Sequence, residues 1–247
     1  MPSTAIVDFI DLTIGVIQEI QKSQRAALAS AANLVANCIA SDGMMFTIGT
    51  GHSYFLAAEP FCRAGGLAPV QQVVSGTLGM VDGSARSSAV EKLCGFAEAV
   101  LSEYDIRKGD VLLVVSNSGR NAVPIESALY ARQQGASVIA VTNVAHSMSE
   151  PSRHPSGQRL LDVADIVLDN CGVHGDAALA LDGLNLKVGP TSTIAGAVLI
   201  NALMAQVTAN LIAMGRTPPV LQSANVDDPD RAVKDRRHLV SRPIKHR

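Results

Sequence analysis

The sequence predicts an α/β fold in which helices cover both faces of a parallel sheet, giving three layers. Short apolar runs typical of buried strands alternate with helical segments of ten or more residues, as parallel strands joined by helical crossovers require. Aromatic residues make up only 3% of the 247 residues and Trp is absent, so Ala, Val, Leu and Ile must build the core. Hydrophobic residues amount to 47%, which is ample for one large core and excludes a disordered chain.

Residues 4–40 predict two helices. In the first helix, apolar side chains recur every three or four positions, at Val7, Ile10, Ile14, Ile17 and Ile20. The second helix is rich in Ala, and its apolar stripe consists of Leu28, Ala31, Leu34, Val35 and Ile39. Gly43 ends it, because glycine favours the backbone turn that follows a helix.

The rest of the chain alternates between strands and helices. We expect strands at 44–49, 69–75, 110–116, 137–142 and 165–170. We expect helices at 54–63, 87–104, 122–134 and 191–214, a last short helix beginning near Asp227 or Asp228, and loops at 76–87 and 143–160. No linker divides the chain, so we expect a single domain over residues 1–247, with amino-terminal helices (1–40), an α/β core (41–215) and a carboxyl-terminal extension (216–247).

Charge and targeting signals exclude several kinds of partner. The net charge is −2 and few aromatic rings are present, so we expect no nucleic-acid partner and no attraction to an anionic membrane. Residues 225–247 carry seven Lys and Arg against four Asp, which favours a solvated last helix or subunit arm over a contact with RNA or phosphate. The amino terminus lacks the basic region of a signal peptide, so we expect a cytoplasmic protein.

Residues 188–215 form an uncharged stretch that bears on assembly. Asn201, Gln206 and Asn210 within it would be costly in lipid, so a buried helix at a subunit interface is favoured over a membrane span. With the apolar amino-terminal helices, it predicts at least a dimer. The four cysteines form no CxxC pair and no Cys/His cluster with zinc-finger spacing, so we expect neither a metal nor another cofactor.

Three segments at predicted strand ends or helix starts are candidates for ligand binding: GTGHSY (49–54), SNSGRN (116–121) and GPTSTIAG (189–196). The first is not a dinucleotide fingerprint, because Tyr54 stands where the third glycine is needed, and no P-loop motif is present. Each segment instead combines glycine with hydroxyl side chains at a helix start, which suits a phosphate. A single such hydroxyl is more often only a helix cap, but three segments at one sheet edge favour a phosphate site.

The stretches GTGHSYF, SNSGRNAVPIESALYARQQGASVIAVTN and VGPTSTIAGAVLINAL together resemble the sugar isomerase (SIS) domain family over roughly residues 25–214. GTGHS, RAGG, SNSGRNA and VGPTST resemble a bacterial phosphosugar-binding, isomerase-like subgroup. The resemblance implies a flavodoxin-like or Rossmann-like five-stranded parallel sheet, a phosphosugar ligand, and a homodimer or homotetramer. Members of the family include ketose–aldose isomerases, a muramic acid phosphate etherase and transcriptional regulators.

The resemblance also implies which residues hold the phosphate. Ser53, Ser116, Ser118 and Thr193 match the family motif, and Ser192 is a weaker candidate. The remaining candidates in the same loops are Gly51, Asn117, Gly119 and Asn121. Asn121 stands where the typical SxSGxT pattern has Thr, although an amide can still donate a hydrogen bond.

Isomerisation moves a proton between C1 and C2 of the sugar and needs a carboxylate base. Glu59 lies where relatives such as the etherase carry a catalytic Glu, and Glu91 lies in a stretch shared with the bacterial subgroup; each is also explained by pairing with a nearby cation, Glu59 with Arg63. His52 or His174 would supply the second acid or base for ring opening.

The resemblance leaves three functions open. We favour an aldose–ketose sugar-phosphate isomerase; the alternatives are a sugar-phosphate etherase or lyase and a non-catalytic phosphosugar sensor. Phe55 stands where the zinc-using sedoheptulose phosphate isomerase branch has a His, so that metal site does not transfer. About 40 residues precede the first predicted strand, too few for the DNA-binding domain of a family regulator.

Overall fold

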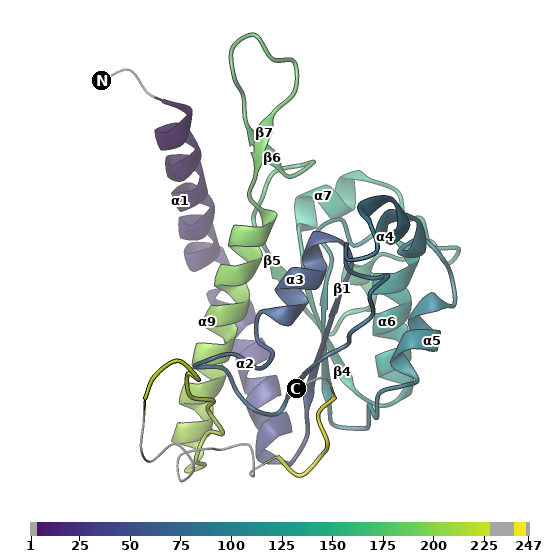
Figure 1. Cartoon of the computed structure of the whole chain (residues 1–247), viewed down its shortest axis with the longest axis vertical. Helices are drawn as coiled ribbons and strands as arrows, with labels where there is room; N and C mark the ends of the chain where they lie inside the picture. The colour runs from purple at the N-terminus through teal and green to yellow at the C-terminus, as the bar shows by residue number, and fades with distance from the viewer. Residues whose placement is uncertain (1–3, 228–239, 246–247) are drawn as a thin grey trace.

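The computed structural model describes residues 4–227 and 240–245, and its centre is a five-stranded, all-parallel sheet (Figure 1). The strands are β1 (Met45–Gly49), β2 (Val70–Gln72), β3 (Val111–Val115), β4 (Ser137–Thr142) and β5 (Ile166–Asp169), in the order β2-β1-β3-β4-β5. The predicted α/β class is confirmed. Strand order reverses between β1 and β3, which makes the carboxyl ends of these two strands the switch point where open sheets bind ligands.

Helices cover both faces of the sheet, as predicted. One face packs against α1 (Ala5–Ser23), α2 (Arg25–Ala40), α3 (His52–Ala58) and α9 (Ser192–Ala213). The other packs against α5 (Phe96–Leu101), α6 (Ala122–Gln133) and α8 (Leu160–Val163). Strand β3 shows why: its side chains are buried on both sides, with Leu113 in one apolar core and Leu112 and Val114 in the other. A strand buried on both faces is apolar at every position.

Several predicted element boundaries are wrong. The helix expected at 87–104 is two helices, α4 (Ser84–Val90) and α5, because Gly95 between them is in the left-handed conformation (φ +81°). The segment expected as a loop at 143–160 contains α7 (Val144–Ser149), whose first turn is capped by the Asn143 side chain. Helix α3 ends just before Pro60 rather than at residue 63. The helix expected near Asp227 falls largely outside the described residues.

A hairpin that the sequence did not predict joins β5 to α9. Its strands, β6 (Ala177–Leu179) and β7 (Val188–Pro190), are antiparallel and project with the start of α1 beyond the carboxyl edge of the sheet (Figure 1). The two projections touch, since a Cβ built on Gly189 would lie 2.6 Å from the Phe9 ring. Only glycine therefore lets β7 approach α1 this closely.

Helix α9 is the one described helix that is long and apolar enough to cross a membrane by length and composition. It packs against α2 and α3, and buried side chains such as Leu199, Leu203 and Val207 lie in the core of the sheet face that it covers. Several of its polar side chains are hydrogen-bonded within the protein, as in the 2.8 Å hydrogen bond from Asn210 Nδ2 to Asn33 Oδ1. These contacts are those of a helix that packs on the core along one side, and the predicted subunit interface stays a prediction.

The last described residues, 240–245, return to the amino edge of the sheet. Arg242 donates hydrogen bonds of 2.6 and 2.8 Å to the two carboxylate oxygens of Asp110, which is 2% exposed. Asp110 also accepts from the backbone N–H groups of Met44 and Arg107. The carboxyl-terminal segment is thus anchored by a buried ion pair to the residue that precedes β3.

Candidate functional site

The loop after β1 brings His52 and Ser53 to the switch point. Gly49 makes this possible, because a Cβ there would lie 2.2 Å from the carbonyl oxygen of Ser53, so helix α3 starts directly against the strand end. Gly51 has a positive φ (+56°), and its N–H donates a 2.9 Å hydrogen bond to the carbonyl of Leu78. The chain turns tightly here and exposes the polar side chains at the start of α3.

The loop after β3 contains Ser116, Asn117, Ser118 and Gly119. The hydroxyl oxygen of Ser116 accepts a 3.2 Å hydrogen bond from the N–H of Gly119, which closes the loop on itself. Gly119 has a positive φ (+59°), and a Cβ there would lie 3.1 Å from the hydroxyl oxygens of Ser147 and Thr142, so a larger residue would meet both strain and crowding. The hydrogen bond to Ser116 and the positive φ of Gly119 together define the conformation of this loop.

Asn121 is the N-cap residue of α6, yet among the described residues no side chain caps the amino end of this helix. The side-chain oxygen of Asn121 instead accepts a 3.1 Å hydrogen bond from Arg153. The N–H of Val123 donates to the carbonyl of Glu91 at 3.0 Å and Pro124 has no N–H, so it is the helix dipole, rather than a set of free N–H groups, that favours an anion in this loop.

The third segment is the start of α9, where a carboxylate already occupies the helix terminus. Asp176 Oδ1 accepts from the backbone N–H groups of Thr191 (3.0 Å) and Ser192 (2.8 Å), and the Ser192 hydroxyl donates to Asp176 Oδ2 at 2.6 Å. Asp176 has a positive φ (+72°) at the base of the hairpin. The Asp176 carboxylate therefore lies where we expected a phosphate to contact Ser192. Thr193, which also lines the pocket, has no hydrogen bond to Asp176 among the described contacts.

These segments converge on one narrow pocket of about 10 Å³. Some of the predicted residues line it together with apolar side chains, and the lining consists of His52, Ser53, Leu56, Val115, Asn117, Val141, Asn170, Ser192 and Thr193. The predicted residues Ser116, Ser118 and Asn121 are not part of this lining. The structure therefore brings residues of all three predicted segments together. The volume is near that of one water molecule, so a larger ligand enters only if the lining side chains move apart.

Sequence reasoning missed two asparagines beneath this pocket. Asn170 donates to the side-chain oxygen of Asn117 (2.7 Å) and accepts from the side chain of Asn143 (3.0 Å). Asn143 directly follows β4, Asn170 directly follows β5, and both side chains are almost fully buried. The signal was present, since a polar residue after each apolar run must lie at the carboxyl edge of a parallel sheet. This network fixes the orientation of the Asn117 amide in the pocket.

The two candidate carboxylates have different surroundings. Glu91 Oε2 accepts a 2.9 Å hydrogen bond from the hydroxyl of Thr50, in the loop after β1. Glu59 forms an ion pair with Arg63, one turn further along the chain, and accepts a 2.8 Å hydrogen bond from Asn201 of α9. Glu91 is therefore hydrogen-bonded to the loop after β1, whereas Glu59 lies at the far end of α3.

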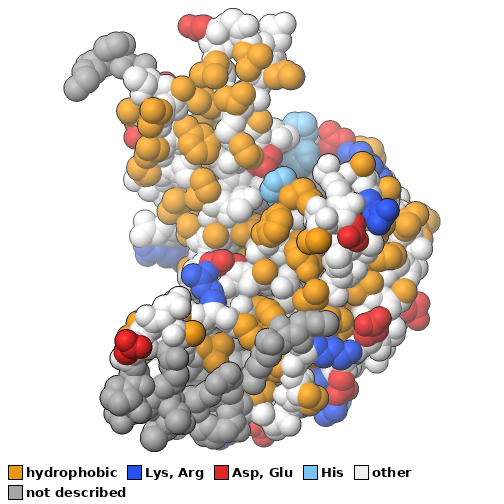
Figure 2. All heavy atoms as spheres, viewed as in Figure 1, with side chains coloured by type: hydrophobic (Ala, Val, Ile, Leu, Met, Phe, Trp, Pro, Cys, Tyr) orange, Lys and Arg blue, Asp and Glu red, His pale blue; other side chains and the backbone are white. Residues whose placement is uncertain are grey.

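The two candidate histidines lie in different places. His52 lines the pocket. His174 lies at the foot of the hairpin, where its Nε2 is 3.3 Å from Glu150 Oε1 and its ring centroid is 4.6 Å from that of His146. Burial, and then the neighbouring His174, lower the pKa of His146. Figure 2 shows histidine side chains beside the hollow between the projecting hairpin and the sheet.

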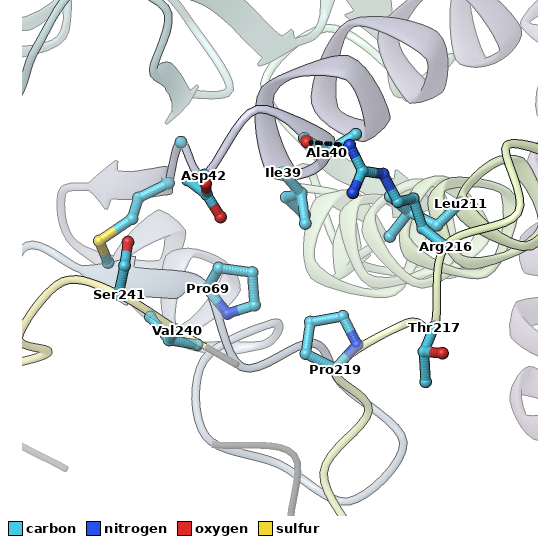
Figure 3. A pocket seen from close by; sticks show the side chains of 12 residues that line it. Ile39, Ala40, Asp42, Pro69, Leu211, Arg216, Thr217, Pro219, Val240 and Ser241 are labelled. Carbon is cyan, nitrogen blue, oxygen red and sulfur yellow. Dashed lines mark hydrogen bonds between the residues drawn. The ribbon is translucent and has the colours of Figure 1, made fainter. Parts of the chain in front are cut away.

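A larger cavity of about 240 Å³ lies at the opposite, amino edge of the sheet (Figure 3). It is lined by Met44 and Pro69, which precede β1 and β2, and by Arg216, whose guanidinium donates to the carbonyl of Ala40 at 3.2 Å. Val240 and Ser241, also in the lining, directly follow residues outside the described part of the chain. It contains none of the predicted site residues, so the narrow pocket at the carboxyl edge is the candidate site.

Comparison with known proteins identifies the family to which this fold belongs. The family model described as the SIS domain matches residues 8–143. A UPF0309 protein of Listeria innocua is 41% identical over 225 residues, 91% of each chain, and a UPF0309 protein of Brucella anthropi is 46% identical over 199 residues, 81% of each chain. The chain therefore belongs to the SIS domain family, among its UPF0309 proteins.

Solved structures share the fold at low sequence identity. A phosphoheptose isomerase from Neisseria gonorrhoeae has a TM-score of 0.53 and 20% identity, covering 83% of this chain and 97% of its own. An E. coli CFT073 protein in complex with A5P has a TM-score of 0.52 and 22% identity, covering 83% and 89%. The Vibrio vulnificus NanR protein complexed with ManNAc-6P has a TM-score of 0.52 and 18% identity, covering 87% and 64%.

Proposed function

We propose that this protein binds the phosphate of a phosphorylated sugar at the carboxyl edge of β1 and β3. The convergence of Ser53, Asn117 and Thr193 on one pocket at the switch point carries the proposal. Hydroxyl and amide donors provide the hydrogen bonds that a phosphate needs, and the dipole of α6 adds partial positive charge at its amino end. The phosphorylated ligands of the structural neighbours, A5P and ManNAc-6P, support the same ligand class.

The reaction that this site supports best is aldose–ketose isomerisation of the sugar phosphate. A base must take the proton from one sugar carbon and return it to the next. Glu91 is the preferred base because Thr50 holds its carboxylate beside the loop that carries His52 and Ser53. Glu59 is the second candidate, and its carboxylate must first leave Arg63 and Asn201. His52, in the pocket lining, is placed to exchange the ring-opening proton.

We propose further that the protein is a cytoplasmic homodimer or homotetramer. The amino-terminal half of α1 exposes Ile6 (73%), Val7 (49%) and Ile10 (51%), and the adjoining hairpin exposes Leu184 and Leu186. Figure 2 shows hydrophobic side chains gathered on the projecting α1 and hairpin. We favour a second copy of the chain as the partner that covers this apolar face, because α1 and the hairpin project from the rest of the protein and leave these side chains exposed.

Binding is tested with hexose, amino-sugar and heptose phosphates and their free sugars in thermal unfolding. A bound sugar phosphate at about 100 times its Kd adds about 2.7 kcal/mol of stability, and the matching free sugar should add none. Ser118→Ala should weaken binding by about 1–2 kcal/mol, since it removes a donor to a charged group. Ser102→Ala, an exposed serine at the end of α5, is the matched control. Equal stabilisation by sugar and sugar phosphate contradicts the phosphate site.

Turnover is tested by NMR in deuterated water with each sugar phosphate that stabilises the protein. An isomerase incorporates deuterium at C2 and yields the ketose or aldose partner. An etherase also exchanges this proton but releases a leaving group. Binding with neither exchange nor product would contradict the enzyme and leave a phosphosugar sensor.

A further inference from the structure

A second group of chemically active side chains lies where the loop before α5, the first half of α6 and the segment after α7 meet. Cys94, Glu126 and His154 each offer one ligand atom, and these atoms all lie within 4.8 Å of one another. The three residues are far apart in the sequence, so no spacing motif reveals them. The fold brings them together outside the residues that line the proposed sugar-phosphate pocket.

Glu126 and His154 are already oriented toward each other. Glu126 Oε2 accepts a 2.8 Å hydrogen bond from the N–H of Gly95, and Glu126 Oε1 lies 3.5 Å from His154 Nε2. The other ring nitrogen, Nδ1, lies 2.8 Å from the hydroxyl of Ser156. The backbone N–H of Ser156 also donates to Nδ1 at 3.3 Å. These contacts with Ser156 fix the orientation of the ring, and a ligating histidine held by a second hydrogen bond is the usual arrangement in metal sites.

We propose that Cys94, Glu126 and His154 bind a zinc ion, with water as the fourth ligand. Sulfur, nitrogen and carboxylate oxygen together suit zinc, whereas magnesium and calcium prefer oxygen alone. Ligand atoms around a tetrahedral zinc lie about 3.5 Å apart, given bond lengths of about 2.0–2.3 Å. The glutamate and histidine already have this separation, and Cys94 is exposed, so rotation of its side chain can close the remaining distance.

The Glu126 carboxylate supplies negative charge for a cation, and the charge of a bound zinc ion favours the thiolate form of Cys94. The side chains of Glu126 and His154 are 18% and 12% exposed, so two of the three ligands are partly shielded from water. A cavity of about 270 Å³ along α5 and α6 borders the cluster and gives an ion and its water a route of entry.

Zinc at this position would brace the proposed active site without entering it. Cys94 follows Glu91 in the same short loop, and the carbonyl of Glu91 accepts a 3.0 Å hydrogen bond from the N–H of Val123 in α6. On the other side of the cluster, Arg153 next to His154 holds the side chain of Asn121. A metal bound by Cys94, Glu126 and His154 therefore ties the loop of the candidate base to the helix of the candidate phosphate loop.

The test is zinc and cobalt binding to the reduced, chelator-treated full-length protein. We expect one zinc per chain by competition with a chromophoric chelator, and a thiolate-to-cobalt charge-transfer band when cobalt replaces zinc. Cys94→Ser and His154→Gln should each weaken zinc binding by about 100-fold or more, because even changes outside the ligand set cost about 10- to 100-fold. Cys62→Ser, a second exposed cysteine, should leave affinity and band unchanged.

Zinc should also raise the melting temperature of the wild type but not of the Cys94→Ser/His154→Gln double variant, whose folding is checked by circular dichroism. Wild-type protein that binds zinc no more tightly than this double variant overturns the proposal. Binding that survives in the double variant and is lost in His174→Gln places the metal at the His146 and His174 pair, and equally overturns it. Neither readout depends on sugar-phosphate binding or turnover.

Discussion

The hydroxyl of Thr50 donates a 2.9 Å hydrogen bond to Glu91 Oε2 and so joins the loop after β1 to the turn that follows α4. Thr50 is the one described residue whose side chain is hydrogen-bonded to this carboxylate. Glu59, by contrast, forms an ion pair with Arg63 and accepts a hydrogen bond from Asn201. A general base must be able to take up a proton, and a carboxylate paired with a cation does so less readily.

Glu91→Gln should therefore remove most of the turnover while leaving binding nearly intact. The amide keeps the size of the side chain and can still accept from Thr50, but it is not a base. We expect kcat to fall by about 100-fold or more and the affinity for the sugar phosphate to change little, because the serine loops provide most of it. A time course of product formation followed by NMR gives kcat, and thermal-shift titration with the sugar phosphate gives the affinity. Glu59→Gln is the matched comparison; if it alone removes turnover, Glu59 is the base and Glu91 is not.

Replacing Arg242 by Ala should destabilise the protein by about 3 kcal/mol, because it leaves the carboxylate of Asp110 buried without its cation. Asp110 is 2% exposed and accepts two hydrogen bonds from Arg242. Urea unfolding at neutral pH measures the loss as a lower midpoint at constant slope. Arg216→Ala removes an exposed guanidinium whose hydrogen bond goes to a carbonyl, and is expected to cost much less. Equal losses in the two variants contradict the anchoring role of Arg242.

His146 should make stability fall in mildly acidic solution. Burial, then His174, lower its pKa below 6.5. The folded state then binds the proton less readily than the unfolded state, so this contribution is complete above pH of about 6.5 and is lost as the pH falls through the lowered pKa. Glu150 acts in a separate range: its hydrogen bond with His174, then Arg120, lower its pKa, so its contribution is lost only below the usual pKa of a glutamate.

His146→Asn should therefore flatten the decline of the urea midpoint between about pH 7 and pH 5.5. The comparison uses the slopes of wild type and variant, since the substitution also removes the acceptor for the Gly175 N–H and lowers stability at every pH. Parallel slopes would show that His146 does not titrate differently in the folded state.

The sheet could be predicted because its cause is local. Runs such as Val111–Val115 are apolar at every position, and only a strand buried on both faces places all five side chains in a core. The hairpin was missed although residues 177–190 contain the Asp182-Gly183 turn dipeptide and alternate apolar and polar residues over 184–188, because a loop rich in Gly and Asp accounts for the same segment. Its strands are positioned by contacts with α1, including that between Phe9 and Gly189, which join residues far apart in the chain.

The site divides in the same way. Ser53, Ser116 and Thr193 could be placed at one edge from the order of strands and helices. The carboxylate of Asp176 at the start of α9 could not, because it comes from the unpredicted hairpin and depends on a positive φ in a residue other than glycine. The cluster of Cys94 with His154 was missed for a similar reason: the helix expected at 87–104 is broken at Gly95, and that break lets the loop turn toward α6.

The apolar face on α1 predicts that the folded protein self-associates. Ile6, Ile10 and Ile14 are 73%, 51% and 46% exposed and recur every four residues, so they form one stripe along the helix. Ile6→Asp/Ile10→Asp places two charges in this stripe without touching a buried side chain, since both positions are exposed. The double variant should sediment with about the 25.7 kDa mass of one chain at micromolar concentration, whereas the wild type should sediment as a dimer or larger. Asp8→Asn/Asp11→Asn, on the same helix, is the control for a general effect of substitutions there. A wild type that sediments as a stable, folded monomer refutes the prediction, and a dimer that persists in the double variant moves the interface away from α1.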